Sequence, residues 1–192
     1  MNVPNVLTVL RFGLTVLFIF AIHAEGVTAK VWAVVYFTAA VVTDFLDGYI
    51  ARKYQLITVF GKIMDPIADK FLTLSAFFIF SRMHIIAGWM FVLICIREVG
   101  VTALRLIAVK RGVALAAEAA GKIKTVLQMA AVYLIMVLII LAQFDIQASW
   151  YPTLISVFIQ GIYVLMIGVV VITLWSGLSF IGNNRKEIFH VR

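Results

Sequence analysis

The 192-residue sequence is 64% hydrophobic and only 13% charged, a balance that excludes a soluble globular protein and predicts an integral membrane protein. At about 20 residues per transmembrane helix, this length accommodates about six spans with short loops and leaves no room for a separate soluble domain. The net charge of +7 could suggest nucleic acid, but the basic residues border apolar stretches, so we expect no nucleic-acid partner and interpret the charge as an orientation signal combined with an anionic ligand or lipid.

The apolar stretches predict an all-α integral membrane protein, a six-transmembrane-helix bundle that forms a single domain over residues 1–192. The predicted spans cover residues 6–24, 31–51, 63–80, 85–109, 120–142 and 150–175. The first stretch could be a signal peptide. It has no Lys or Arg before Arg11, however, and five more apolar stretches follow, so we predict a retained first span.

The first span carries a line of polar residues. Asn5, Thr8 and Arg11 recur every three residues, which places them along one side of the first two helical turns. Arg11 could be an interfacial anchor, as basic residues near a membrane surface often are, or it could contribute to a functional site. The spacing alone leaves both interpretations open.

Four aspartates lie where the second span ends and the third begins. Asp44 and Asp47 are three residues apart, and Asp65 and Asp69 are four apart, so each pair shares one helical face. A carboxylate in a bilayer costs about 2.5 to 3.5 kcal/mol on insertion scales, so these side chains must face each other, a cavity or a cation. Both pairs belong to the same membrane side, and we predict a polar cavity there.

The fourth and fifth spans carry a deep basic set. Arg97 and Arg105 are eight residues apart, close to two turns, and therefore share a face, while Lys122 and Lys124 lie at the start of the fifth span. These four residues offer a pocket for a phosphate dianion. Glu98 could pair with neighbouring helices or belong to a ligand shell.

The basic residues also predict the orientation. The odd-numbered loops contain only Lys30 and Arg82. The even-numbered loops and the tail are flanked by Arg52, Lys53, Lys110, Arg111, Lys122, Arg185, Lys186 and Arg192. The positive-inside rule then places both termini and the aspartates on the cytoplasmic side of a multi-pass membrane protein.

Two facing pairs of aspartates suit hard divalent cations, which take oxygen ligands. Two such ions about 3.5 to 4 Å apart would suit phosphoryl transfer and would neutralise the four carboxylates. A substrate diphosphate would then be met by Arg52 and its neighbours. Gly48 and Ala51 lie one turn after Asp44 and Asp47, and Gly61 lies one turn before Asp65, so small residues border each pair and permit close approach.

The aspartate motif resembles the signature of the CDP-alcohol phosphotransferase family, without a departure at any defined position. The motif is Asp44-x-x-Asp47-Gly48-x-x-Ala51-Arg52, eight residues, Gly61-x-x-x-Asp65-x-x-x-Asp69. Further stretches resemble a bacterial branch of that family, so the resemblance covers most of the chain. They are Pro4-Asn5-x-Leu7-Thr8-x-x-Arg11, Arg97-Glu98 with Thr102 and Leu104-Arg105, and Gly121-Lys122-x-Lys124-Thr125.

The resemblance implies specific roles for these residues. Asp44, Asp47 and Asp65, with help from Asp69, would bind two divalent ions, Mg²⁺ or Mn²⁺, and Asp69 would be the general base. The donor would be CDP-diacylglycerol. Its nucleotide would lie near Thr8, Gly48, Ala51, Arg52 and Gly61. The acceptor would be glycerol 3-phosphate, whose hydroxyl attacks the lipid-linked phosphorus and expels CMP. The resemblance also implies a homodimer in a bacterial cell membrane, surrounded by membrane lipids.

Two alternatives remain at this stage. An enzyme of the same reaction type could use another phosphate-bearing acceptor, such as inositol phosphate. A divalent-cation transporter could use the same carboxylates. Transport sites usually lie near the bilayer midplane, however, and a transporter would have no use for the deep basic set. A purely structural pairing of Asp with Arg would leave the spacing unexplained.

Overall fold

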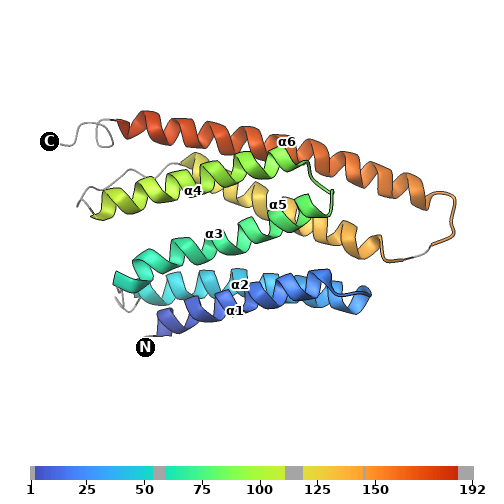
Figure 1. Ribbon diagram of the computed structural model, residues 1–192, viewed down its shortest axis with the longest axis horizontal. Coiled ribbons are helices and arrows are strands. Elements are labelled where there is room, and N and C mark those ends of the chain that lie inside the picture. Colours follow the sequence, from blue (N-terminus) through green and yellow to red (C-terminus); the bar gives the residue numbers. More distant parts are fainter. Residues whose placement is uncertain (1–2, 54–58, 111–118, 145, 186–192) are drawn as a thin grey trace. The chain divides into compact units, whose positions relative to one another are not determined.

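A computed structural model describes residues 3–53, 59–110, 119–144 and 146–185, and these residues form six helices and no strand. Figure 1 shows the helices in chain order. Their bounds are α1 Val3–His23, α2 Val27–Lys53, α3 Val59–Arg82, α4 Gly88–Lys110, α5 Ala119–Leu141 and α6 Tyr151–Asn183. The prediction of an all-α fold with six helices is confirmed.

Four of the described helices are long and apolar enough to cross a membrane. These stretches are Val6–His23, Val27–Tyr49, Ile123–Leu141 and Tyr151–Asn183. Helices α3 and α4 carry the charged residues that the sequence had suggested as functional, among them Asp65 and Asp69 in α3 and Arg97 and Glu98 in α4. The chain is thus a multi-pass membrane protein, and candidate site residues also lie on the apolar helices α1, α2 and α5.

Several helix boundaries differ from the predicted ones. Helix α6 continues to Asn183, through Gly177, whereas the predicted span ends at residue 175. Helix α3 begins at Val59, so Pro66 lies inside the helix rather than in its first turn. Proline has no backbone N–H and removes one hydrogen bond of the helix at that point. Helix α4 begins only at Gly88, because His84 adopts a positive φ of 58° in the preceding turn.

The chain divides into two compact units. Unit 1 comprises Met1–Ile79 and Met136–Tyr151, and unit 2 comprises Phe80–Ile135 and Pro152–Arg192. Unit 1 therefore contains α1, α2 and nearly all of α3, whereas unit 2 contains α4, most of α5 and nearly all of α6.

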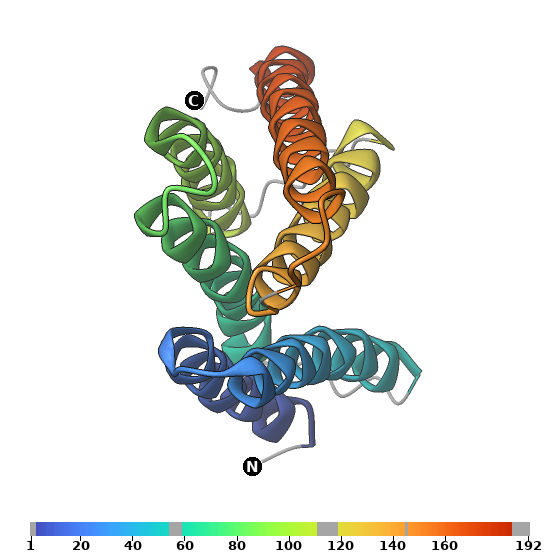
Figure 2. The same ribbon diagram turned by 90° about the vertical axis from the view of Figure 1, so that its right-hand side faces the viewer.

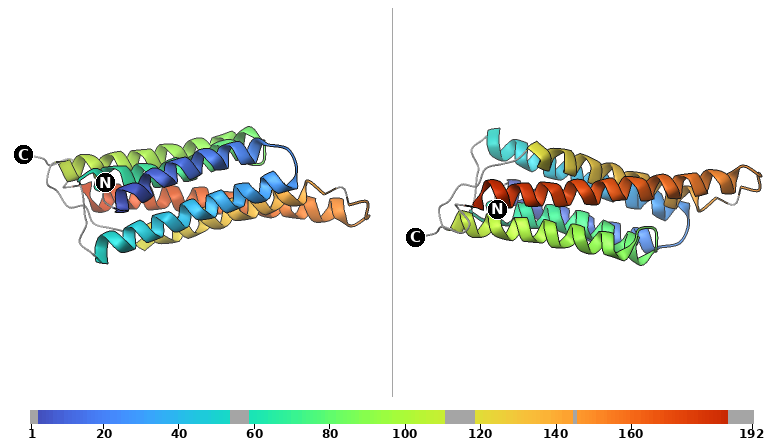
Figure 3. Two further views of the ribbon diagram at one scale, coloured as in Figure 1. Left: turned by 90° about the horizontal axis from the view of Figure 1, so that it is seen from below. Right: turned by 90° about the horizontal axis from the view of Figure 1, so that it is seen from above.

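Helices α1 and α2 form an antiparallel hairpin in unit 1 (Figure 3). The short connection contains Gly26 at a φ of 88°, a conformation that glycine adopts without strain. Figure 2 looks at the end of the hairpin where this connection lies. Phe18 and Phe37 pack with ring centroids 5.4 Å apart, and Ala33 and Ala40 are fully buried. Small residues of this kind let membrane helices approach closely, since lipid offers no hydrophobic driving force between them.

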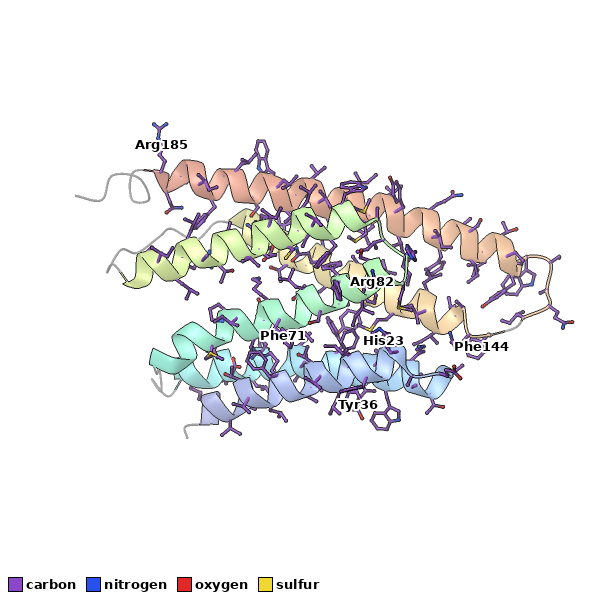
Figure 4. All side chains as sticks on the ribbon, in the orientation of Figure 1. His23, Tyr36, Phe71, Arg82, Phe144 and Arg185 are labelled. Carbon is purple, nitrogen blue, oxygen red and sulfur yellow. The ribbon has the colours of Figure 1, made fainter. Side chains whose placement is uncertain are left out.

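Helix α3 packs beside α1 and runs in the same direction. The Thr8 hydroxyl contacts Asp65 near the start of both helices, and further along the rings of Phe12 and Phe71 lie 5.5 Å apart. Phe71 is labelled in Figure 4 on the side of α3 that faces α1. Helix α1 is therefore in contact with both carboxylate-bearing helices.

Lys30 stabilises the end of α1. Its ammonium donates hydrogen bonds to the carbonyl oxygens of Ile22 at 2.6 Å and Ala24 at 2.8 Å. The last carbonyls of a helix have no intrahelical donor, and a cation there also meets the negative end of the helix dipole. Lys30 is only 7% exposed, so this charge is a capping group rather than a solvated loop residue.

We expect Lys30→Met to lower the free energy of unfolding by about 1 to 3 kcal/mol, because the buried carbonyl of Ile22 and the partly buried carbonyl of Ala24 lose their donor. The measurement is thermal unfolding of the purified protein in detergent. Arg82→Met is the matched control, since Arg82 is an exposed cation in the last turn of α3 and its removal should change stability by less than about 0.5 kcal/mol. Equal shifts in the two variants would contradict the capping role.

Candidate active site

The four aspartates belong to unit 1 and lie in one region of it. Asp44 and Asp47 occupy the last turns of α2, and Asp65 and Asp69 lie on α3. Asp44 is within electrostatic range of Asp65 and Asp69, and Asp47 is within range of Asp65. The structure thus brings together two carboxylate pairs, one on α2 and one on α3, that are separated in the sequence.

Arg11 of α1 lies between the two carboxylates of α2. Its Nη1 is 2.7 Å from Oδ1 of Asp44, and its Nη2 donates to Oδ2 of Asp47 in a second ion pair. The Arg11 side chain is 0% exposed and that of Asp47 is 4% exposed, whereas that of Asp44 is 44% exposed. The guanidinium is therefore sealed inside the site, which excludes the interpretation of Arg11 as an interfacial anchor.

The α3 carboxylates have different partners. The hydroxyl of Thr8, itself 1% exposed, donates to Oδ1 of Asp65 at 2.6 Å. Asp69 forms an ion pair with the adjacent Lys70 at 3.0 Å, and its side chain is 31% exposed. Asp69 and Asp44 are thus accessible from outside the site, while Asp47 is enclosed.

Among the described side chains, two cations, Arg11 and Lys70, pair with Asp44, Asp47 and Asp69. The donor set consists of carboxylate oxygens, the ligands that hard divalent cations prefer, so its chemistry fits Mg²⁺ or Mn²⁺. Within the described ranges, no three His, Cys, Asp or Glu side chains converge as ligands of one ion.

The remaining residues of the predicted nucleotide site lie at the same helix ends. Gly48 is half-buried in α2, one turn after Asp44. Ala51 and Arg52 belong to the last turn of α2, and Gly61 to the first turn of α3, but their side chains lie outside the described part of the chain.

A second polar cluster, in unit 2, is centred on Glu98. Glu98 Oε1 accepts from Lys124 Nζ of α5, from Arg97 Nη1 at 3.1 Å and from Gln128 Nε2 at 3.4 Å. Gln128 also contacts the Thr173 hydroxyl of α6 at 3.4 Å. Glu98 is 1% exposed and Lys124 4%. The cluster therefore connects α4, α5 and α6 through buried polar contacts.

Arg97 is held against α6. Its Nη2 donates to the Ser176 hydroxyl at 2.6 Å, and its side chain crosses directly over Gly177. A Cβ at position 177 would lie 2.9 Å from Arg97 Cγ and 3.3 Å from Nε, closer than side chains tolerate. The glycine thus makes room for the arginine, and Figure 3 shows α4 and α6 side by side in this part of unit 2.

The structure brings only part of the predicted basic set together. Among the described side chains, Arg97 and Lys124 share one acid, Glu98. Arg105 is exposed, with its guanidinium 5.5 Å from the centre of the Phe180 ring. The side chain of Lys122 lies outside the described part of the chain.

Several residues of the cluster around Glu98 were not predicted from the sequence. Gln128, Thr173, Ser176 and Gly177 received no role, because isolated small or polar residues in apolar helices are common. Their spacing offered a signal: Lys124 and Gln128 are one turn apart, as are Thr173 and Gly177, so each pair shares a helical face. Glu98 had been left between two interpretations, and the structure shows it pairing with residues of neighbouring helices.

Comparison with known proteins identifies similar chains. The model of the family described as CDP-alcohol phosphatidyltransferase matches residues 1–180. A probable phosphatidylglycerophosphate synthase of Mycobacterium tuberculosis is 40% identical over 136 residues, which are 68% of this chain and 64% of that protein. A CDP-diacylglycerol--glycerol-3-phosphate 3-phosphatidyltransferase of Bacillus subtilis is 38% identical over 143 residues, which cover 68% of this chain and 74% of that protein. One of the same name from Pectobacterium atrosepticum is 28% identical over 97% of both chains. The match thus spans less than two thirds of the mycobacterial relative, 64% of its length.

We expect Gly177→Ala to displace Arg97 and to break its contacts with Ser176 and Glu98. Overpacking of this kind costs about 1 to 3 kcal/mol, which thermal unfolding in detergent would detect as a lower melting temperature. Gly168→Ala, on the same helix, is the matched control because a Cβ there meets nothing within 4 Å. It should be neutral or slightly stabilising, since alanine favours helix more than glycine does. A Gly177→Ala protein as stable as the Gly168→Ala protein would contradict the close contact.

Proposed function

Because the chain belongs to the CDP-alcohol phosphatidyltransferase family, we propose that it transfers the phosphatidyl group of CDP-diacylglycerol to sn-glycerol 3-phosphate, which yields phosphatidylglycerophosphate and CMP. The observation that carries this proposal is the clustering of four carboxylates on α2 and α3 within a chain whose relatives are named for that reaction. The family match extends over both units, which supports a single domain.

The carboxylates would divide the work of the reaction. Two divalent ions, Mg²⁺ or Mn²⁺, held by Asp44, Asp47, Asp65 and Asp69, would polarise the diphosphate and stabilise the departing CMP. Asp69 would accept the proton of the attacking hydroxyl. Its 31% exposure supports this role, because a general base must be within reach of the acceptor.

The two substrates would use different residues. For CDP-diacylglycerol we propose Thr8, Gly48, Ala51, Arg52 and Gly61. The hydrogen bond from Thr8 to Asp65 supports this set, because it places the hydroxyl beside the carboxylates. The acceptor phosphate would contact Arg97, Arg105, Lys122 and Lys124. The grouping of the two cations Arg97 and Lys124 around Glu98 supports that assignment, since a phosphate dianion is bound by clustered cations.

We place both termini and the active site on the cytoplasmic side of a bacterial cell membrane. The distribution of Lys and Arg supports the orientation, and the bacterial origin of the relatives supports the compartment. A water-soluble acceptor would reach the site from the cytosol, and the lipid donor would reach it through the bilayer. We propose a homodimer as the assembly, on the basis of the family resemblance.

The proposed acceptor is tested by supplying purified protein with CDP-diacylglycerol, Mg²⁺ and a panel of acceptors and measuring CMP release. We expect turnover with glycerol 3-phosphate and little with inositol phosphate or glycerol. Failure with glycerol 3-phosphate would refute the acceptor, and turnover with inositol phosphate instead would reassign it. Mg²⁺ flux into liposomes without CMP formation would refute the proposed enzyme activity and favour a divalent-cation transporter.

We expect Asp69→Asn to reduce CMP release by at least about a hundredfold, because general-base catalysis typically contributes that much or more. Metal-dependent binding of CDP-diacylglycerol should largely survive, since the other three carboxylates remain. Glu25→Gln, which removes an exposed acid from the loop after α1, is the matched control and should leave turnover unchanged. Near-normal turnover in the Asp69→Asn protein would exclude Asp69 as the base.

A further inference from the structure

The ion pairs of Arg11 point to a role beyond that of a fixed structural contact. We propose that Arg11 is the resident counter-cation of Asp44 and Asp47, and that a divalent metal ion and the Arg11 guanidinium compete for these two carboxylates. The inference rests on the proposed function, because it takes the aspartates as the metal site. It assigns Arg11 a role in setting how tightly that site binds its ions.

The geometry places the guanidinium where a shared ligand of both carboxylates must lie. Asp44 and Asp47 are one turn apart on one face of α2, and separate nitrogens of Arg11 contact them, with Nη1 2.7 Å from Asp44. The charge of the guanidinium thus lies between the two carboxylates. Arg11 contacts one oxygen of each carboxylate, so an ion bound by both would share them with the guanidinium, whose positive charge repels it.

Burial explains why such an occupant is needed. The Asp47 side chain is 4% exposed, and a buried carboxylate without a partner is strongly destabilising. Arg11, on a different helix, is 0% exposed, so its guanidinium neutralises Asp47 at a position that solvent does not reach. Without metal, Arg11 keeps the site folded. When a metal ion binds, its charge neutralises the two carboxylates in place of the guanidinium, and the contacts of Arg11 with them weaken.

The consequence is a measurable coupling between residue 11 and metal affinity. Replacing Arg11 by a neutral residue removes the competitor, so the affinity for a divalent ion should rise. Coupling between two binding events typically amounts to 5- to 150-fold, and we expect about tenfold tighter binding. The metal-free variant should be less stable than the parent, and metal should restore a larger part of its melting temperature.

The experiment titrates Mn²⁺ into the full-length protein in detergent and measures free Mn²⁺ by electron paramagnetic resonance, which does not depend on turnover. Parent, Arg11→Gln and Arg185→Gln are compared. Arg185 is an exposed cation at the end of α6, labelled in Figure 4, and its removal should leave the affinity unchanged. We expect tighter Mn²⁺ binding only in Arg11→Gln. Melting temperatures with EDTA and with Mn²⁺ are measured on the same samples.

Equal or weaker Mn²⁺ binding by Arg11→Gln would overturn the competition while leaving the metal site intact. A parent protein that binds no Mn²⁺, or whose binding is unaffected by Asp47→Asn, would instead refute the metal site of the proposed function. Should Arg11→Gln fail to fold, Arg11→Lys takes its place. The lysine ammonium lacks the planar fork with which two separate nitrogens of Arg11 contact the two carboxylates, so its hold on the pair should be weaker and Mn²⁺ binding should again be tighter than in the parent. Unchanged binding would overturn the proposal.

Discussion

Carboxylates on apolar helices require counter-charges, and the packing of unit 1 is arranged to supply them. An aspartate at the centre of a membrane helix costs about 2.5 to 3.5 kcal/mol on insertion scales, so the helices that surround it must offer a cation or a hydrogen-bond donor. Helix α1 contributes Arg11 to the carboxylates of α2 and Thr8 to Asp65 of α3. Apolar packing in lipid gives little directionality, whereas these contacts set which faces of the three helices meet.

In unit 2 two described cations are paired with one buried acid, Glu98. Glu98 lies between Arg97 and Lys124, and contacts from Gln128 and Ser176 complete the cluster. Among the described side chains, unit 1 groups four carboxylates with two cations, whereas unit 2 groups two cations around one acid.

The sequence predicted the helices and the grouping of the aspartates well, because span length and helical periodicity are local properties. It could not predict which cation meets which acid, because that depends on how helices pack. Asn5, Thr8 and Arg11 indicated a polar side of α1 but not its partners. Lys30 was counted as a loop charge, although it caps α1. Gly177 was expected beyond the last span, whereas α6 continues through it and packs Arg97 there.

Helix α6 is longer than the hydrocarbon layer of a bilayer requires. Its 33 residues extend for about 50 Å at about 1.5 Å per residue, whereas the hydrocarbon layer of a bilayer is about 30 Å thick. Trp175 is 70% exposed, and tryptophans on membrane helices gather at the level of the lipid headgroups. The next residue, Ser176, holds the guanidinium of Arg97. The guanidinium of Arg97 is therefore held within one residue of an exposed tryptophan on α6, the residue type that gathers at the headgroup level.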